Sequence, residues 1–321
     1  MWKFILRRVL LMIPQLFILS IIVFAMAKAM PGDALSGKVM DPGISPERIE
    51  ELREQMGLND PMHTQYIRWV SNVAQGDFGQ SYTHKTKVMN VIEDRVWQTV
   101  YLSLFTVIII YALAIPLGIL SGRYNDSWID KAITGYTYVG FATPTFIFGL
   151  IVLFLFGFTF DLFPTGGTVS SKVDEGTFAY FLSKLNHMVL PAFSAALIST
   201  VGVVQYLRSE VVDNKLKDYV RTARSKGIPE SKVYSRHILR NSFLPIAAFL
   251  GYEITGLIGG SIIIETIFSY PGIGQLFVTS ISLRDFSVVT ALVMLTGFAT
   301  LLGTLLSDII LSAVDPRIRI E

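Results

Sequence analysis

The feature that most constrains this chain is the distribution of its charged residues. Only three of 52 charged residues, Glu253, Glu265 and Asp308, fall inside six long apolar blocks. The blocks are Val9–Ala27, Val100–Leu120, Ile133–Phe160, Met188–Leu207, Leu244–Phe268 and Val288–Val314. A helix of about 20 apolar residues crosses a bilayer, where an ionised side chain costs at least about 3 kcal/mol. The sequence therefore predicts an all-α, polytopic membrane protein with six transmembrane helices.

Lysine and arginine predict how the six helices are oriented. If the chain starts in the cytoplasm, the inner segments hold 16 basic residues in 63 positions, and the outer segments hold 11 in 118. The positive-inside rule favours this arrangement, so we expect cytoplasmic N- and C-termini. Ala25-Met26-Ala27 resembles a signal-peptidase site, but an apolar run of this length favours a retained anchor over a cleaved signal peptide.

Composition and motifs exclude several function classes. The chain has no cysteine, which excludes disulfides and thiolate metal sites, and its net charge of +2 is too small to indicate nucleic-acid binding. The segment 32–39 has P-loop-like spacing but places Val39 where a Ser or Thr would ligate Mg²⁺. The four histidines lie scattered over separate loops. We therefore predict a non-catalytic chain without a metal site or a bound cofactor.

The chain divides into an N-terminal segment with the first helix (1–27), an external loop (28–99) and a five-helix core (100–321). The external loop carries two predicted helices. One begins at Ser45-Pro46, and the other follows Asp60-Pro61 and ends at Gly76. This cap either contacts an external partner or only packs on the outer ends of the membrane helices.

The inner loop 208–243 is polar, basic and longer than a simple connector. Gly227 followed by Ile228-Pro229-Glu230 predicts a break between two short helices, because glycine suits the end of a helix and proline its first turn. A helical turn held between two membrane spans is suited to transmit a force from a docked partner. The alternative, a solvated positive-inside loop, explains the charge but leaves the break unexplained.

Prolines occur in five of the six blocks. Pro116 and Pro144 lie deep in their blocks, and we expect them to bend the helices around a cavity. Pro144 is therefore also a candidate position in the translocation pathway. Pro191 and Pro245 lie near block ends and are interpreted as helix starts.

Small residues and intramembrane polar groups give further site candidates. Two pairs at four-residue spacing favour close helix packing: Gly256 with Gly260, and Ala299 with Gly303. Glu253 lies in mid-span and is a candidate for the translocation pathway, with Gln205 as a weaker one. For both, a satisfied interhelical contact is the alternative. Glu265 and Asp308 lie near span ends, where we expect them to cap a helix or pair with interfacial groups.

Motifs along the whole chain resemble one family. Residues 218–245, DYVRTARSKGIPESKVYSRHILRNSFLP, are similar to the EAA loop of bacterial ABC importer permeases, in the version found in oligopeptide/dipeptide permeases. Further matches to the B-type subunit are Phe4–Arg8 with Pro14 and Pro31-Gly32-Asp33, Leu58–Pro61, Gly76–Ser81, Ile264–Phe268, Pro271–Leu276 and Asp315-Pro316-Arg317.

The resemblance implies a type I importer architecture in the bacterial plasma (inner) membrane. The expected partners are a second, C-type permease subunit, two cytoplasmic ATPases that bind ATP and Mg²⁺, an external substrate-binding protein and a peptide substrate. The expected ATPase-coupling residues are Arg221, Thr222, Ala223, Lys226, Gly227, Ile228, Pro229 and Glu230. Nickel chelates, glutathione or a signalling peptide are alternative substrates. A self-contained secondary transporter or channel, and a membrane assembly protein, are alternative classes.

Overall fold

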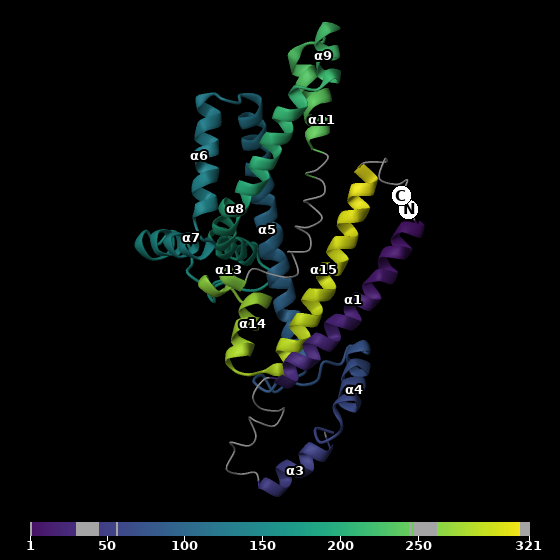
Figure 1. The fold of residues 1–321 in the computed structure, drawn as a ribbon. Helices are drawn as coiled ribbons and strands as arrows, with labels where there is room; N and C mark the ends of the chain where they lie inside the picture. Colours follow the sequence, from purple (N-terminus) through teal and green to yellow (C-terminus); the bar gives the residue numbers. More distant parts are fainter. Residues whose placement is uncertain (1, 30–44, 56, 244–245, 247–261, 315–321) are drawn as a thin grey trace.

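A computed structural model describes residues 2–29, 45–55, 57–243, 246 and 262–314. Within these residues the secondary structure is helical, and the only β-type pairing is an isolated bridge between Gln80 and Lys87. Figure 1 shows long helices side by side, with short helices at both ends of the molecule. The predicted all-α fold is confirmed.

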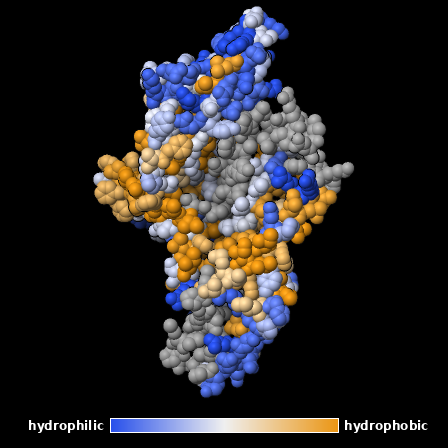
Figure 2. Space-filling view, viewed as in Figure 1, coloured by the Kyte–Doolittle hydropathy of each residue, from blue (hydrophilic) through white to orange (hydrophobic). Residues whose placement is uncertain are grey.

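Four helices in the described part of the chain are long and apolar enough to cross a membrane: α1 (Trp2–Ala29), α5 (Val88–Arg123), α8 (Phe178–Lys215) and α15 (Phe286–Val314). Figure 2 shows hydrophobic side chains mostly around the middle of the molecule and hydrophilic surface toward both ends. The chain is therefore a multi-pass membrane protein. Most of the predicted fifth block, Leu244–Phe268, lies outside the described residues, so the six-helix count and the cytoplasmic termini stay predictions.

The predicted third block is broken. Helix α6 (Trp128–Ala142) ends before Pro144, and α7 (Thr145–Val152), continued by a π-helix, η1 (Leu153–Thr159), leaves it at 103°. Pro144 has an extended backbone (ψ 132°), and proline has no N–H to continue the helical ladder. The predicted bend is confirmed, and the block Ile133–Phe160 is not one continuous helix; its third span stays a prediction.

The other prolines behave differently. Helix α5 continues through Pro116 without a break, so the bend expected there is not seen as a helix interruption. Pro191 lies inside α8 and does not start it, because that helix already begins at Phe178. Pro191 is buried, and α8 continues through it although proline removes one ladder hydrogen bond. The interpretation of Pro191 as a helix start is wrong.

Helices α5 and α8 run parallel and very close together. A Cβ on Gly118 would lie 2.9 Å from the Cβ of Leu207, and a Cβ on Gly122 would lie 2.6 Å from the Cβ of Val211. The two glycines are one turn apart on α5, and their partners are one turn apart on α8. The glycines therefore set the distance between the two helices near their C-terminal ends.

Helices α1 and α15 form an antiparallel pair (Figure 1). The Nε of Arg8 lies 3.1 Å from an Oδ2 of Asp308, and further along the pair Leu19 packs against Gly297. The expected pairing of Asp308 is confirmed.

The small residues of α15 are packed inside the chain. Ala299 and Gly303 are buried, as helix packing requires. Gly256 and Gly260 lie outside the described residues.

The external loop folds into a helical cap at the end of the molecule opposite α9 (Figure 1). Its helices are α3 (Pro46–Gln55) and α4 (Met62–Ala74). Gly57 and Gly76 follow them with φ of +65° and +80°, a conformation that favours glycine. Helix α4 packs on α1, where the Tyr66 hydroxyl lies 2.8 Å from the Ser20 hydroxyl. Both predicted cap helices are confirmed.

Candidate functional site

The inner loop forms a helical turn at the end of α8. Helix α9 (Asp218–Ser225) is followed by the short α10 (Glu230–Lys232), the π-helix η2 (Val233–Ile238) and α11 (Leu239–Ser242). We call residues 218–238 the coupling turn. Figure 1 shows it projecting beyond the other helices.

Gly227 closes the first helix of the coupling turn as the sequence predicts. Its φ is +70°, and a Cβ there would meet nothing within 4 Å. Its N–H donates to the carbonyl of Arg224 (2.9 Å), and the N–H of Ile228 donates to the carbonyl of Ala223 (3.3 Å). Glycine is therefore required here by its backbone conformation and not by crowding.

An ion pair holds the two halves of the coupling turn together. The Arg224 guanidinium donates to both carboxylate oxygens of Glu230, with Nη2–Oε1 at 2.7 Å and Nε–Oε2 at 3.2 Å. These hydrogen bonds lower the pKa of Glu230 and raise the pKa of Arg224. The sequence prediction included Glu230 but not Arg224 as its partner. The sequence could have indicated this pair, because Arg224 and Glu230 lie on either side of the Gly227-Ile228-Pro229 break.

The predicted coupling residues occupy two faces. Most are exposed: Arg221, Thr222, Lys226, Gly227, Pro229 and Glu230. Ala223, in contrast, is buried with 4% exposure, and Ile228 packs on the same core. Ala223 therefore packs beneath α9 in the core, and its contact with an ATPase stays a prediction.

The core beneath the coupling turn continues into the membrane helices. Val220 of α9 and Val233 of η2 are fully buried in one cluster with Leu207 and Val211 of α8 and Ala114 of α5. The coupling turn therefore shares one close-packed core with α5 and α8.

The structure describes two of the three predicted pathway residues, Gln205 and Pro144. The Gln205 side chain on α8 donates to the Thr137 hydroxyl on α6 (2.5 Å), which is the interhelical contact considered as an alternative. Pro144 is exposed at the α6–α7 break. Glu253 lies outside the described residues.

Glu265 caps a helix. It lies in α13 (Ile262–Ile267) and is fully buried. Its carboxylate accepts hydrogen bonds from the Thr99 hydroxyl (2.9 Å) and from the N–H groups of Gly274 (2.6 Å) and Gln275 (3.1 Å) at the start of α14 (Ile273–Ser282). The expected capping role of Glu265 is confirmed.

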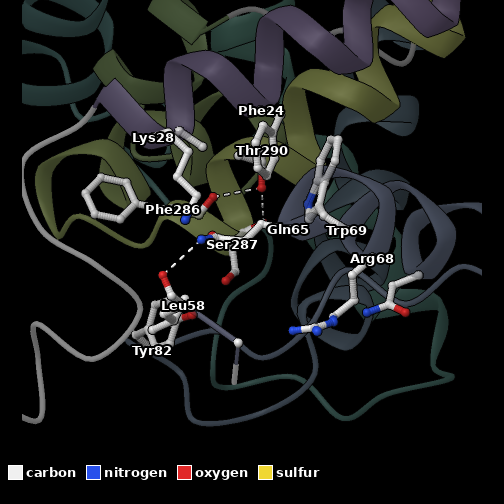
Figure 3. Close-up of a pocket in the computed structure, with 13 residues that line it drawn as sticks. Phe24, Lys28, Leu58, Gln65, Arg68, Trp69, Tyr82, Phe286, Ser287 and Thr290 are labelled. Carbon is white, nitrogen blue, oxygen red and sulfur yellow. Dashed lines mark hydrogen bonds between the residues drawn. The ribbon is translucent and has the colours of Figure 1, made fainter. Parts of the chain in front are cut away.

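A cavity of about 290 Å³ lies between the cap, the C-terminal end of α1 and the N-terminal end of α15. Figure 3 shows its lining from three elements: Phe24 and Lys28 of α1, Gln65, Arg68 and Trp69 of α4, and Phe286, Ser287 and Thr290 of α15. The cap is thus packed on the membrane helices and also leaves a polar and aromatic hollow between them. Elsewhere in the described ranges, no three His, Asp or Glu side chains converge as metal ligands.

Comparison with known proteins places these features in one family. A family model for the binding-protein-dependent transport system inner membrane component matches residues 114–320, and the model for the N-terminal part of such components matches residues 1–103.

Full-length relatives agree with the family models. The chain is 40% identical to the oligopeptide transport system permease protein AppB of Bacillus subtilis (strain 168) over 319 residues, which cover 99% of both chains. It is 33% identical to the dipeptide transport system permease protein DppB of Escherichia coli (strain K12) over 336 aligned positions, again covering 99% of both chains. It is also 30% identical to the glutathione transport system permease protein GsiC of Escherichia coli O1:K1 / APEC over 319 residues, with 99% of each chain covered. The chain therefore belongs to the family of binding-protein-dependent transport system inner membrane components, as an oligopeptide/dipeptide-type ABC permease.

Proposed function

We propose that this chain is the permease subunit of an ATP-driven importer of peptides and forms half of its translocation pathway. The observation that carries the proposal is the coupling turn: an exposed, glycine-closed helical turn whose core is continuous with two membrane helices. The family membership and the peptide permeases among the relatives support the same role.

In this proposal the exposed face of the coupling turn enters a groove on a cytoplasmic ATPase. Closure of an ATPase pair pushes the turn, and the shared core passes the displacement to α5 and α8. The membrane helices then alternate between inward-open and outward-open arrangements. ATP and Mg²⁺ are bound by the partner subunits, and this chain contributes no catalytic group and no cofactor.

The proposed assembly lies in the bacterial plasma membrane and contains a second, C-type permease subunit, two ATPases and an external substrate-binding protein. The cap of residues 28–99, together with residues 269–287, is the proposed docking surface for the binding protein. Peptides are the proposed substrates, with glutathione as the alternative that one relative's name supports. Glu253 and Pro144 remain the proposed pathway positions.

Substitution of Gly227 tests the proposal, with a matched control at the same position. Gly227→Val forces a β-branched residue into positive φ, which such residues strongly disfavour. Gly227→Asn introduces a side chain of similar size that tolerates this conformation. In reconstituted vesicles, we expect the Val variant to retain the ATPases but lose uptake at least tenfold, and the Asn variant to retain most uptake. Normal uptake and normal ATPase stimulation by the Val variant would refute the coupling role.

A further inference from the structure

Helices α5 and α6 form a hairpin joined by residues 124–127. Its tip contains a buried charge that the sequence prediction did not single out. Asp130, in the first turn of α6, is 3% exposed. The Arg208 guanidinium of α8 donates a hydrogen bond to each of its carboxylate oxygens, with Nε–Oδ1 at 2.6 Å and Nη2–Oδ2 at 2.7 Å. The Ser121 hydroxyl (2.5 Å) and the Asp126 N–H (2.8 Å) also donate to it. A bidentate, fully hydrogen-bonded pair of this kind fixes both distance and orientation.

A second cation, Lys215 at the C-terminal end of α8, contacts the same hairpin. The Lys215 ammonium donates to the backbone carbonyls of Gly122 and Arg123 (3.1 Å each) and to the Asn125 side chain (2.5 Å). Lys215 thereby satisfies carbonyl groups that the end of α5 would otherwise leave without a partner.

The hairpin also contacts the coupling turn directly. The Arg123 guanidinium lies 4.9 Å from the ring centroid of Tyr234 in η2 and 5.3 Å from that of Tyr124. These are distances at which a cation interacts favourably with an aromatic face.

Close backbone approach extends this attachment along α6. A Cβ on Gly140 would lie 2.4 Å from a methyl of Val201 on α8, and Gln205 bonds Thr137 between these two ends of the contact. Helix α6 is thus held to α8 from its first turn almost to its end.

We infer that Asp130, Arg208 and Lys215 are positioning residues that fasten the α5–α6 hairpin to α8, so that the hairpin, α8 and the coupling turn move as one rigid body during transport. The inference rests on the proposed function, because it concerns how the motion of the coupling turn reaches the membrane. If the coupling turn were attached to α8 alone, its motion would move only that helix. With the hairpin attached, α5, α6 and α8 move together. Separating Asp130 from Arg208 would leave a buried charge without its partner, which is costly. The contact between the hairpin and α8 should therefore persist throughout the cycle.

A disulfide tests the rigid body directly, because the chain contains no native cysteine. A Cβ at Gly140 lies 3.6 Å from the Cβ of Val201, within the range that a disulfide spans. In the double variant Gly140→Cys with Val201→Cys, assembled with its ATPases, we expect the oxidised and reduced forms to import within twofold of each other. A tenfold loss of uptake on oxidation that reductant reverses would show that α6 and α8 separate, and would overturn the inference. Failure of the disulfide to form in the assembled complex would overturn it too.

A variant that removes the charge of Asp130 tests the contact between the hairpin and α8. We expect Asp130→Asn to lower the peptide imported per ATP hydrolysed at least fivefold in complexes that retain the ATPases, and Asp130→Glu to restore part of this ratio. The control is Asp308→Asn, which removes one partner of a more exposed ion pair and should leave the ratio unchanged. An unchanged ratio of peptide imported to ATP hydrolysed in Asp130→Asn would overturn the positioning role of Asp130 while leaving the proposed function intact. A wild-type chain that binds no ATPase would instead refute the proposed function.

Discussion

Replacing Glu265 by alanine should destabilise the folded chain substantially. The carboxylate is fully buried and accepts three hydrogen bonds, one from Thr99 and two from the first N–H groups of α14. Alanine leaves all three donors without this acceptor. Each buried donor that loses its acceptor costs about 1–3 kcal/mol, so the free energy of unfolding should fall by at least about 3 kcal/mol. Glu265→Gln can keep its amide oxygen toward the two N–H groups and turn its NH₂ group toward the Thr99 hydroxyl, which can accept a hydrogen bond, so its effect should be clearly smaller.

Unfolding by SDS in mixed micelles, followed by tryptophan fluorescence, measures these differences. Asp308→Asn is the control, because its ion pair with Arg8 is partly exposed and pairs of this kind contribute about 0–1 kcal/mol. If Glu265→Ala unfolds within about 0.5 kcal/mol of the wild-type chain, the carboxylate does not hold α14 in the way described.

Two further changes can be measured in the same way. Gly272→Ala would place a Cβ 2.4 Å from the Cδ of Glu265 and should cost about 1–3 kcal/mol, whereas Gly135→Ala, which meets nothing within 4 Å on α6, should be neutral or stabilising by up to about 1 kcal/mol; equal effects would contradict the crowding at Gly272. Arg224 lowers the pKa of Glu230 below its ordinary 4.5, so the pair should stabilise the coupling turn fully above pH 4.5 and lose this contribution as the pH falls through the lowered pKa. The difference in unfolding free energy between wild type and Glu230→Gln should therefore shrink only in that acidic range, and a difference that grows on acidification would contradict the assignment.

Features fixed by local backbone chemistry were predictable from the sequence. Gly227 and Pro229 mark the break in the coupling turn, and Pro46 with Gly57 marks the ends of the first cap helix, because glycine and proline restrict the backbone wherever they occur. The apolar blocks predicted the long helices for a similarly local reason: hydrocarbon excludes charge over each span independently.

Features that depend on packing were not predictable in this way. Asp130 and Arg208 lie 78 residues apart, and in the sequence they were only two charges in inner segments. Pro144 breaks its helix and Pro191 does not, although the local sequence of each allowed either result. Pro191 is buried within α8 and Pro144 is exposed at the break, but exposure alone does not decide the result, because α5 continues through the exposed Pro116.

The central claim is that this chain works as the membrane half of an ATP-driven importer. The most direct measurement is a pull-down of the tagged chain in mild detergent, with mass spectrometry of the proteins that accompany it and a transport assay of the isolated complex. We predict recovery of a second permease and two ATPases, and peptide uptake that requires ATP. Recovery of this chain alone, in a form that moves solute across liposomes without ATP, would contradict the account.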